Sequence, residues 1–121
     1  MGTIDWAGVA LSALAAFAVL ALAFRKAPGV RRTGWIVTGA VLSIVPAAML
    51  GHALARIGPD KLAAKPQLFF MQSGGLAIAF VLPALWLTQL RDDAPRRQTV
   101  VDSLAFIAAY LAMGAVFWVR A

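Results

Sequence analysis

Residues 39–52 read GAVLSIVPAAMLGH, and this stretch indicates what kind of structure the chain forms. Small side chains recur here at every fourth position, namely at Gly39, Ser43, Ala47 and Gly51. In a helix, that spacing forms a nearly straight groove of small side chains, against which a second helix can pack closely. His52, the only histidine of the chain, ends the stretch. It lies about 100° around the helix from the nearest small residue.

The amino-acid composition is typical of a membrane protein. Of the 121 residues, 62% are hydrophobic and only 13% are charged, whereas soluble domains are about half apolar and about a quarter charged. A soluble fold of this size has too much surface to hide so many apolar side chains. The net charge of +6 comes from basic residues between the apolar runs, where they meet lipid headgroups rather than nucleic acid. The lack of cysteine excludes disulfides and thiolate metal sites.

Four apolar runs are long enough to cross a bilayer, because about 20 helical residues span its hydrocarbon core. They cover approximately residues 4–24, 34–55, 66–90 and 99–119. The segments between them are short, so successive spans must be antiparallel neighbours. We therefore predict an all-α fold: an antiparallel four-helix transmembrane bundle with short loops and no extramembrane domain. Residues 1–121 then form a single membrane domain.

The basic residues predict an orientation. The first and third connecting segments carry seven of the 11 Lys and Arg residues, and the opposite side of the membrane carries four. By the positive-inside rule, these two segments are cytoplasmic and both termini are periplasmic. The Ala- and Arg-rich composition indicates a high-GC bacterium, so we predict a multi-pass protein of the bacterial inner membrane. A cleaved signal peptide is the competing interpretation of the first run, but Asp5 stands where a basic segment would be expected.

Each predicted span has one face of small residues and one face of bulky residues. In the third span, the small face carries Gly75 and Ala79 in line with Gln72 and Trp86. Lipid tails are as apolar as leucine, so close packing and interhelical hydrogen bonds drive helix association in a membrane. We therefore expect the small faces to point into the bundle.

One group of polar residues is predicted near the outer surface, at similar depth in three spans: His52, Gln72, Asp5 and Ser73. Ionisable groups within spans are candidates for function, and histidine titrates near neutral pH. The group is therefore a candidate proton-responsive or ligand-binding site. The alternative is an interfacial His52 that bonds to Gln72 or to a backbone carbonyl and helps the helices pack. Its position beside the small-residue groove also allows it to face the headgroups.

A second group lies at the predicted cytoplasmic face, where Asp102 opens the fourth span beside Arg91, Arg96 and Arg97. One interpretation makes Asp102 a contact for an ion or a substrate. The favoured interpretation is a helix cap that pairs with a loop arginine, because an aspartate at a helix start accepts backbone N–H groups. Asp5 is expected to cap the first span in the same way.

The sequence shows no pattern of catalytic residues, phosphate-binding loop or metal motif, so we predict a protein that is not an enzyme and has no cofactor. The first hypothesis is a protein that acts by helix packing, as an accessory subunit of a larger membrane complex or as a homo-oligomer. Its partners are then the lipid bilayer and other membrane subunits or itself, and not nucleic acid. One alternative is a small transporter or channel with a site near His52. Another is a protein that binds lipid, pigment or quinone between its helices.

Three segments carry a resemblance to a known family: IDWAGVALSALAAFAV (residues 4–19), GLAIAFVLPALWL (75–87) and VVDSLAFIAAYLAMGAVFWV (100–119). With these segments, the chain resembles a bacterial family of small four-span membrane proteins classed as a domain of unknown function. It departs from that family after the first span, where the family has a longer segment containing aromatic residues. The resemblance implies a four-span architecture and no activity or site residue.

Overall fold

The computed structural model describes residues 3–27 and 33–121. Within these residues, four helical segments are long and apolar enough to cross a membrane. The first two are α1 (Trp6–Ala23) and α2 (Thr33–Ile57). The third, Gln67–Arg91, is continuous but consists of α4 (Gln67–Leu76), the π-helical η2 (Ala77–Val81) and α5 (Leu82–Arg91). The fourth is α6 (Arg96–Arg120). The predicted all-α bundle of four membrane helices is confirmed.

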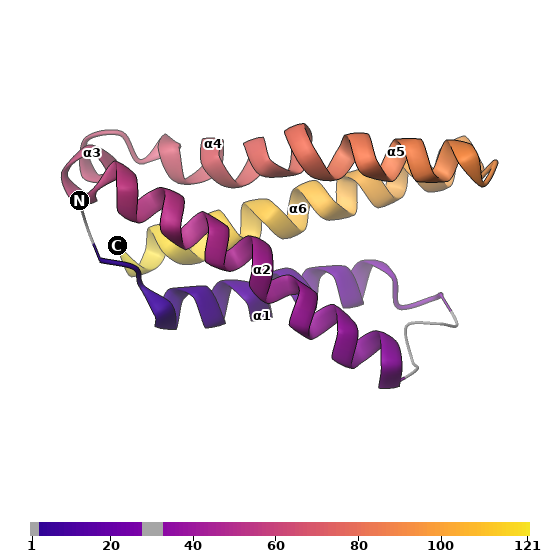
Figure 1. Ribbon diagram of the computed structural model, residues 1–121, viewed down its shortest axis with the longest axis horizontal. Coiled ribbons are helices and arrows are strands. Elements are labelled where there is room, and N and C mark those ends of the chain that lie inside the picture. Colours follow the sequence, from indigo (N-terminus) through magenta and orange to yellow (C-terminus); the bar gives the residue numbers. More distant parts are fainter. Residues whose placement is uncertain (1–2, 28–32) are drawn as a thin grey trace.

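The helices form an elongated bundle in which α6 is the central element (Figure 1). It packs extensively against α1 and α4, less against α5, and only slightly against α2. The start of α1 and the end of α6 lie at one end of the bundle, as does the short helix α3 (Pro59–Ala64). The connection between α5 and α6 lies at the opposite end. The segment predicted as the second loop contains the short helix α3. This helix starts directly after Gly58, which has a positive φ of 92°.

The small-residue groove of α2 lies against α1. Ser43, Ala47 and Gly51 are buried, and Gly39 is half-buried against the ring of Phe17. A methyl group on Gly51 would lie only 2.8 Å from a methyl carbon of Val9. The two backbones can approach this closely because no larger side chain separates them.

The third span faces the bundle with a different set of residues from the predicted one. Its buried residues are Phe69, Ser73, Gly74 and Ala77, whereas Gly75 and Ala79 are exposed. The inward face is determined by α6, where Gly114 leaves space for the Ser73 side chain and the Phe69 carbonyl. The prediction that Gly75 and Ala79 point inward is therefore wrong.

The π-helical segment explains why one straight stripe does not describe this span. The Leu82 N–H donates to the carbonyl of Ala77, five residues earlier, in place of the usual four. Pro83 follows at once, and it has no N–H to give to the carbonyl of Ala79. Each residue of an α-helix turns the chain by about 100°, so the extra residue shifts the faces of α4 and α5 relative to each other.

Candidate functional site

An open cavity of about 970 Å³ lies at the end of the bundle that carries α3. We call it the terminal cavity. Its walls come from the start of α1, the end of α2, α3, the start of α4 and the end of α6. Leu54, Phe69 and Phe117, all buried residues of the apolar core, form part of its lining. The lining of the cavity is therefore largely apolar, and it also includes the charged side chains described next.

An ion pair joins the first and last membrane helices beside the terminal cavity. Arg120 donates from Nε to Asp5 Oδ2 at 2.8 Å and from Nη2 to Asp5 Oδ1 at 3.1 Å. Asp5 also accepts the Gly8 N–H at 3.0 Å, which confirms that it caps α1. The hydrogen bond from Arg120 is the main reason that the pKa of Asp5 lies below its usual value. The carboxylate therefore remains charged at neutral pH and holds the two helix ends together.

The other residues predicted to join Asp5 lie apart from this ion pair. His52 is exposed and does not line the cavity. Its Nδ1 lies 2.7 Å from the Ala48 carbonyl oxygen of its own helix, and its ring packs edge-on against Trp6 at a centroid distance of 5.7 Å. The structure thus agrees with the interpretation in which His52 bonds to a backbone carbonyl and faces away from the groove.

Ser73 and Gln72 also make no polar contact with the ion pair. Ser73 is fully buried, and its hydroxyl donates to the Phe70 carbonyl at 3.4 Å. Gln72 is half-buried on the neighbouring face of α4. Throughout residues 3–27 and 33–121, no hydrogen bond joins any two of the four predicted residues. They occupy one end of the bundle without forming one cluster.

The prediction that Asp102 caps the fourth span and pairs with a nearby arginine is wrong. Asp102 lies inside α6, which starts at Arg96 after Pro95, and so it does not cap the helix. Its Oδ2 accepts a hydrogen bond from Gln89 Nε2 at 2.7 Å. The early start of α6 turns Asp102 toward α5, which is the physical reason that it meets Gln89 and not the loop.

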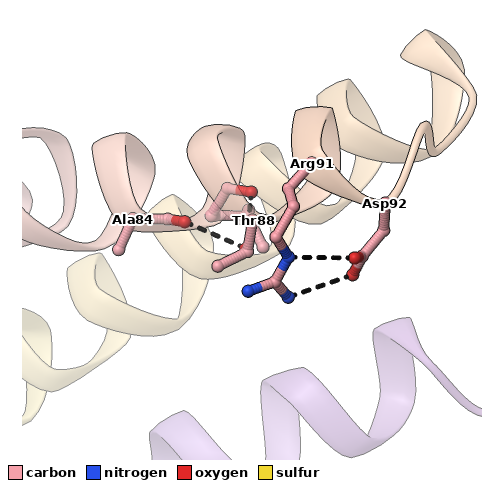
Figure 2. A network of polar contacts seen from close by, with 5 residues as sticks. Ala84, Thr88, Arg91 and Asp92 are labelled. Atoms are coloured by element: carbon pink, nitrogen blue, oxygen red, sulfur yellow. Dashed lines mark hydrogen bonds and ion pairs between the residues drawn. The ribbon is translucent and has the colours of Figure 1, made fainter.

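The arginines beside Asp102 make other contacts. Arg91 pairs with the adjacent Asp92, with Nε 3.0 Å from Oδ1. One turn earlier, the Thr88 hydroxyl donates to the Ala84 carbonyl of the same helix (Figure 2). Arg96 lies over the ring of Trp86, 5.7 Å from its centroid. Arg97 is exposed.

Two side-chain hydrogen bonds hold α5 against α6. Besides the bond from Gln89 to Asp102, Trp86 Nε1 donates to Ser103 Oγ at 2.9 Å. Gln89 Oε1 is buried without a hydrogen-bond partner in the described part of the chain. No residue of α5 is buried, so polar contacts rather than close apolar packing attach this helix.

No family model, curated protein or solved structure matches the chain. The resemblance to the four-span family therefore stays a prediction, and function must be argued from the geometry. No sequence pattern pointed to a role for Arg120, Asp60 or Gln89. A signal for the first was present, because Asp5 and Arg120 carry opposite charges at span ends predicted on the same side of the membrane.

Proposed function

We propose that the chain is a non-enzymatic integral membrane protein that acts by helix packing, as a subunit of a larger complex or as a homo-oligomer. The outward face of the third span supports this proposal best. Gly75 and Ala79 are exposed there, one helical turn apart, and a side chain at Gly75 would meet no atom within 4 Å. Small residues gain little from contact with lipid, but they let another helix approach closely.

The small number of buried residues in parts of the bundle gives further support. The helix α5 has no buried residue. In the first half of α2, the side chains of Ile36, Val37 and Val41 are about half exposed, at 45%, 56% and 57%. A neighbouring subunit would cover faces that the chain itself leaves open. We further propose the bacterial inner membrane as its location, with both termini in the periplasm, from the distribution of basic residues.

The absence of cysteine from the chain allows a direct test. A single Gly75→Cys variant should form disulfide-linked dimers in native membranes, or a larger adduct if the partner is another protein. Leu14→Cys is the matched control, because Leu14 is 65% exposed on α1, a different helix. A Gly75→Leu variant should lose the oligomer or the co-purifying partner in mild detergent. Equal cross-linking at both cysteine positions, with a monomer that carries no partner, would contradict the proposal.

The terminal cavity favours a second function, the binding of an amphiphile between helices. Its lining combines mostly apolar residues with a few charged ones, as the lining of small-ligand sites generally does. Retention of lipid by the purified protein would test this function independently of Gly75, which does not line the cavity. Protein that binds no lipid or detergent at a defined stoichiometry would count against it.

A further inference from the structure

The charges that line the terminal cavity do not cancel. Among the residues that the structure describes, three charged side chains line it: Asp5, Asp60 and Arg120. Asp5 and Arg120 neutralise each other through their ion pair. Asp60 is exposed and takes part in neither of the two ion pairs found in the described residues. Among the lining side chains, Asp60 therefore keeps a negative charge that is free to pair with a cationic group in the ligand.

Arg120 has hydrogen-bond donors left for a second acceptor. Its bonds to Asp5 use Nε and Nη2, whereas a guanidinium has five N–H donors over three nitrogens. The two N–H groups of Nη1 are not used by Asp5. The cavity edge thus offers an acceptor at Asp60 and donors at Arg120, a pattern that matches a ligand carrying both charges.

The position of the cavity points to an amphiphile. Trp6 and Trp118 line it and are 60% and 49% exposed. Tryptophans of this kind mark the level of the headgroups in a membrane. A ligand at this level can place its polar head between the charged residues and its acyl chains along the exposed apolar helix faces.

We propose that the terminal cavity binds the headgroup of a zwitterionic aminophospholipid, the class that includes phosphatidylethanolamine. Asp60 accepts hydrogen bonds from the primary ammonium, and Arg120 donates from Nη1 to the phosphate. An anionic lipid would leave Asp60 facing a second negative group or a neutral hydroxyl. This inference rests on the second function proposed above, amphiphile binding in the cavity.

The test is a competition between two lipids. Delipidated protein is incubated with equal amounts of phosphatidylethanolamine and phosphatidylglycerol in detergent, and retained lipid is counted by native mass spectrometry. We expect the protein to retain about fivefold more phosphatidylethanolamine, the size of one exposed ion pair. Asp60→Asn should bring the ratio close to one. Asp92→Asn is the matched control, because it removes an exposed carboxylate at the other end of the bundle.

Each result supports or overturns the assignment. Equal retention of both lipids by the wild type, or a preference that Asp60→Asn leaves intact, overturns the aminophospholipid but leaves amphiphile binding in place. Retention of neither lipid overturns amphiphile binding as well. Because Asp60 is exposed on α3, the variant should fold, and an unchanged unfolding midpoint in detergent verifies this.

Discussion

Replacement of Gly114 by alanine tests the packing of α4 on α6. A methyl group there would lie 2.8 Å from the Phe69 carbonyl oxygen and 3.1 Å from Ser73 Cβ, and it would overlap Ser73 Oγ. The serine hydroxyl can turn to another rotamer. The carbonyl cannot, because it belongs to the backbone of α4.

The cost follows from this geometry. To restore an ordinary contact of 3.4 Å from 2.8 Å, the two helices must separate by about 0.6 Å, which loosens every neighbouring contact along the interface. Overpacking of this kind costs about 1–3 kcal/mol. We therefore expect Gly114→Ala to lower the free energy of unfolding by about 2 kcal/mol.

The assay is unfolding by SDS in mixed micelles, followed by tryptophan fluorescence. Gly75→Ala is the control, since a side chain at Gly75 meets nothing within 4 Å, and its free energy of unfolding should equal that of wild type or exceed it by up to about 1 kcal/mol, because alanine favours the helix over glycine. Ser73→Gly combined with Gly114→Ala should recover part of the loss and leave the part due to the Phe69 carbonyl. The same stability for wild type and Gly114→Ala would refute the reasoning.

Three further predictions concern the helix cap, the buried amide and the first half of α2. Asp5→Ala should cost about 1 kcal/mol at neutral pH through the lost cap. Since the pKa of Asp5 is lowered on folding, its contribution is complete above the usual carboxyl value of 3.8 and disappears as the pH falls below it. The difference in free energy of unfolding between wild type and variant should therefore be larger at pH 7 than at pH 3. Gln89→Leu leaves Asp102 without its donor and should cost about 1–3 kcal/mol, whereas Gln89→Leu/Asp102→Leu should lie closer to wild type; a double variant less stable than the single one would contradict this. Phe17→Ala removes the ring that packs on Gly39 and should speed hydrogen exchange in the first half of α2 by at least about tenfold, while exchange in the second half stays unchanged.

The four membrane helices could be predicted because they depend on little more than bilayer thickness and hydropathy. The start of the fourth was predicted three residues late, at residue 99 rather than at Arg96. Basic residues were assigned to the loop, although arginine side chains can extend from the end of a membrane helix to the interface. Because of this late start, Asp102 was interpreted as a helix cap, although it lies inside α6.

The face of the third span could not be predicted from a regular period. A step of about 100° for every residue is valid only while the hydrogen bonds run from i to i−4. The π-helical segment interrupts that pattern between Gly75 and Trp86. The exposure of Gly75 itself, which precedes this segment, depends on where α6 packs against α4. Pro83 indicates an irregularity in the helix. A proline in a membrane helix more often produces a kink than a π-helical segment, however, and its position does not identify the affected face.

The pairing of Asp5 with Arg120 depended on information that hydropathy does not contain. Their opposite charges and their predicted position on the same side of the membrane allowed an ion pair between the two residues. Short loops, however, predict only that consecutive spans are neighbours, and α1 also packs closely on α6, the last helix in the chain. Asp102 had three nearby arginines in the sequence and pairs with none of them in ion pairs of the described residues.

The central position of α6 has a consequence for biosynthesis. Ribosomes deliver the helices to the membrane in chain order, so the helix that contacts α1, α4 and α5 is also the final one to arrive. Until then, α1 has only its contacts with α2 and lacks those with α6. The interior shared by α1, α4 and α5 can therefore close only after α6 has entered the membrane, whereas α1 and α2 can already pack against each other.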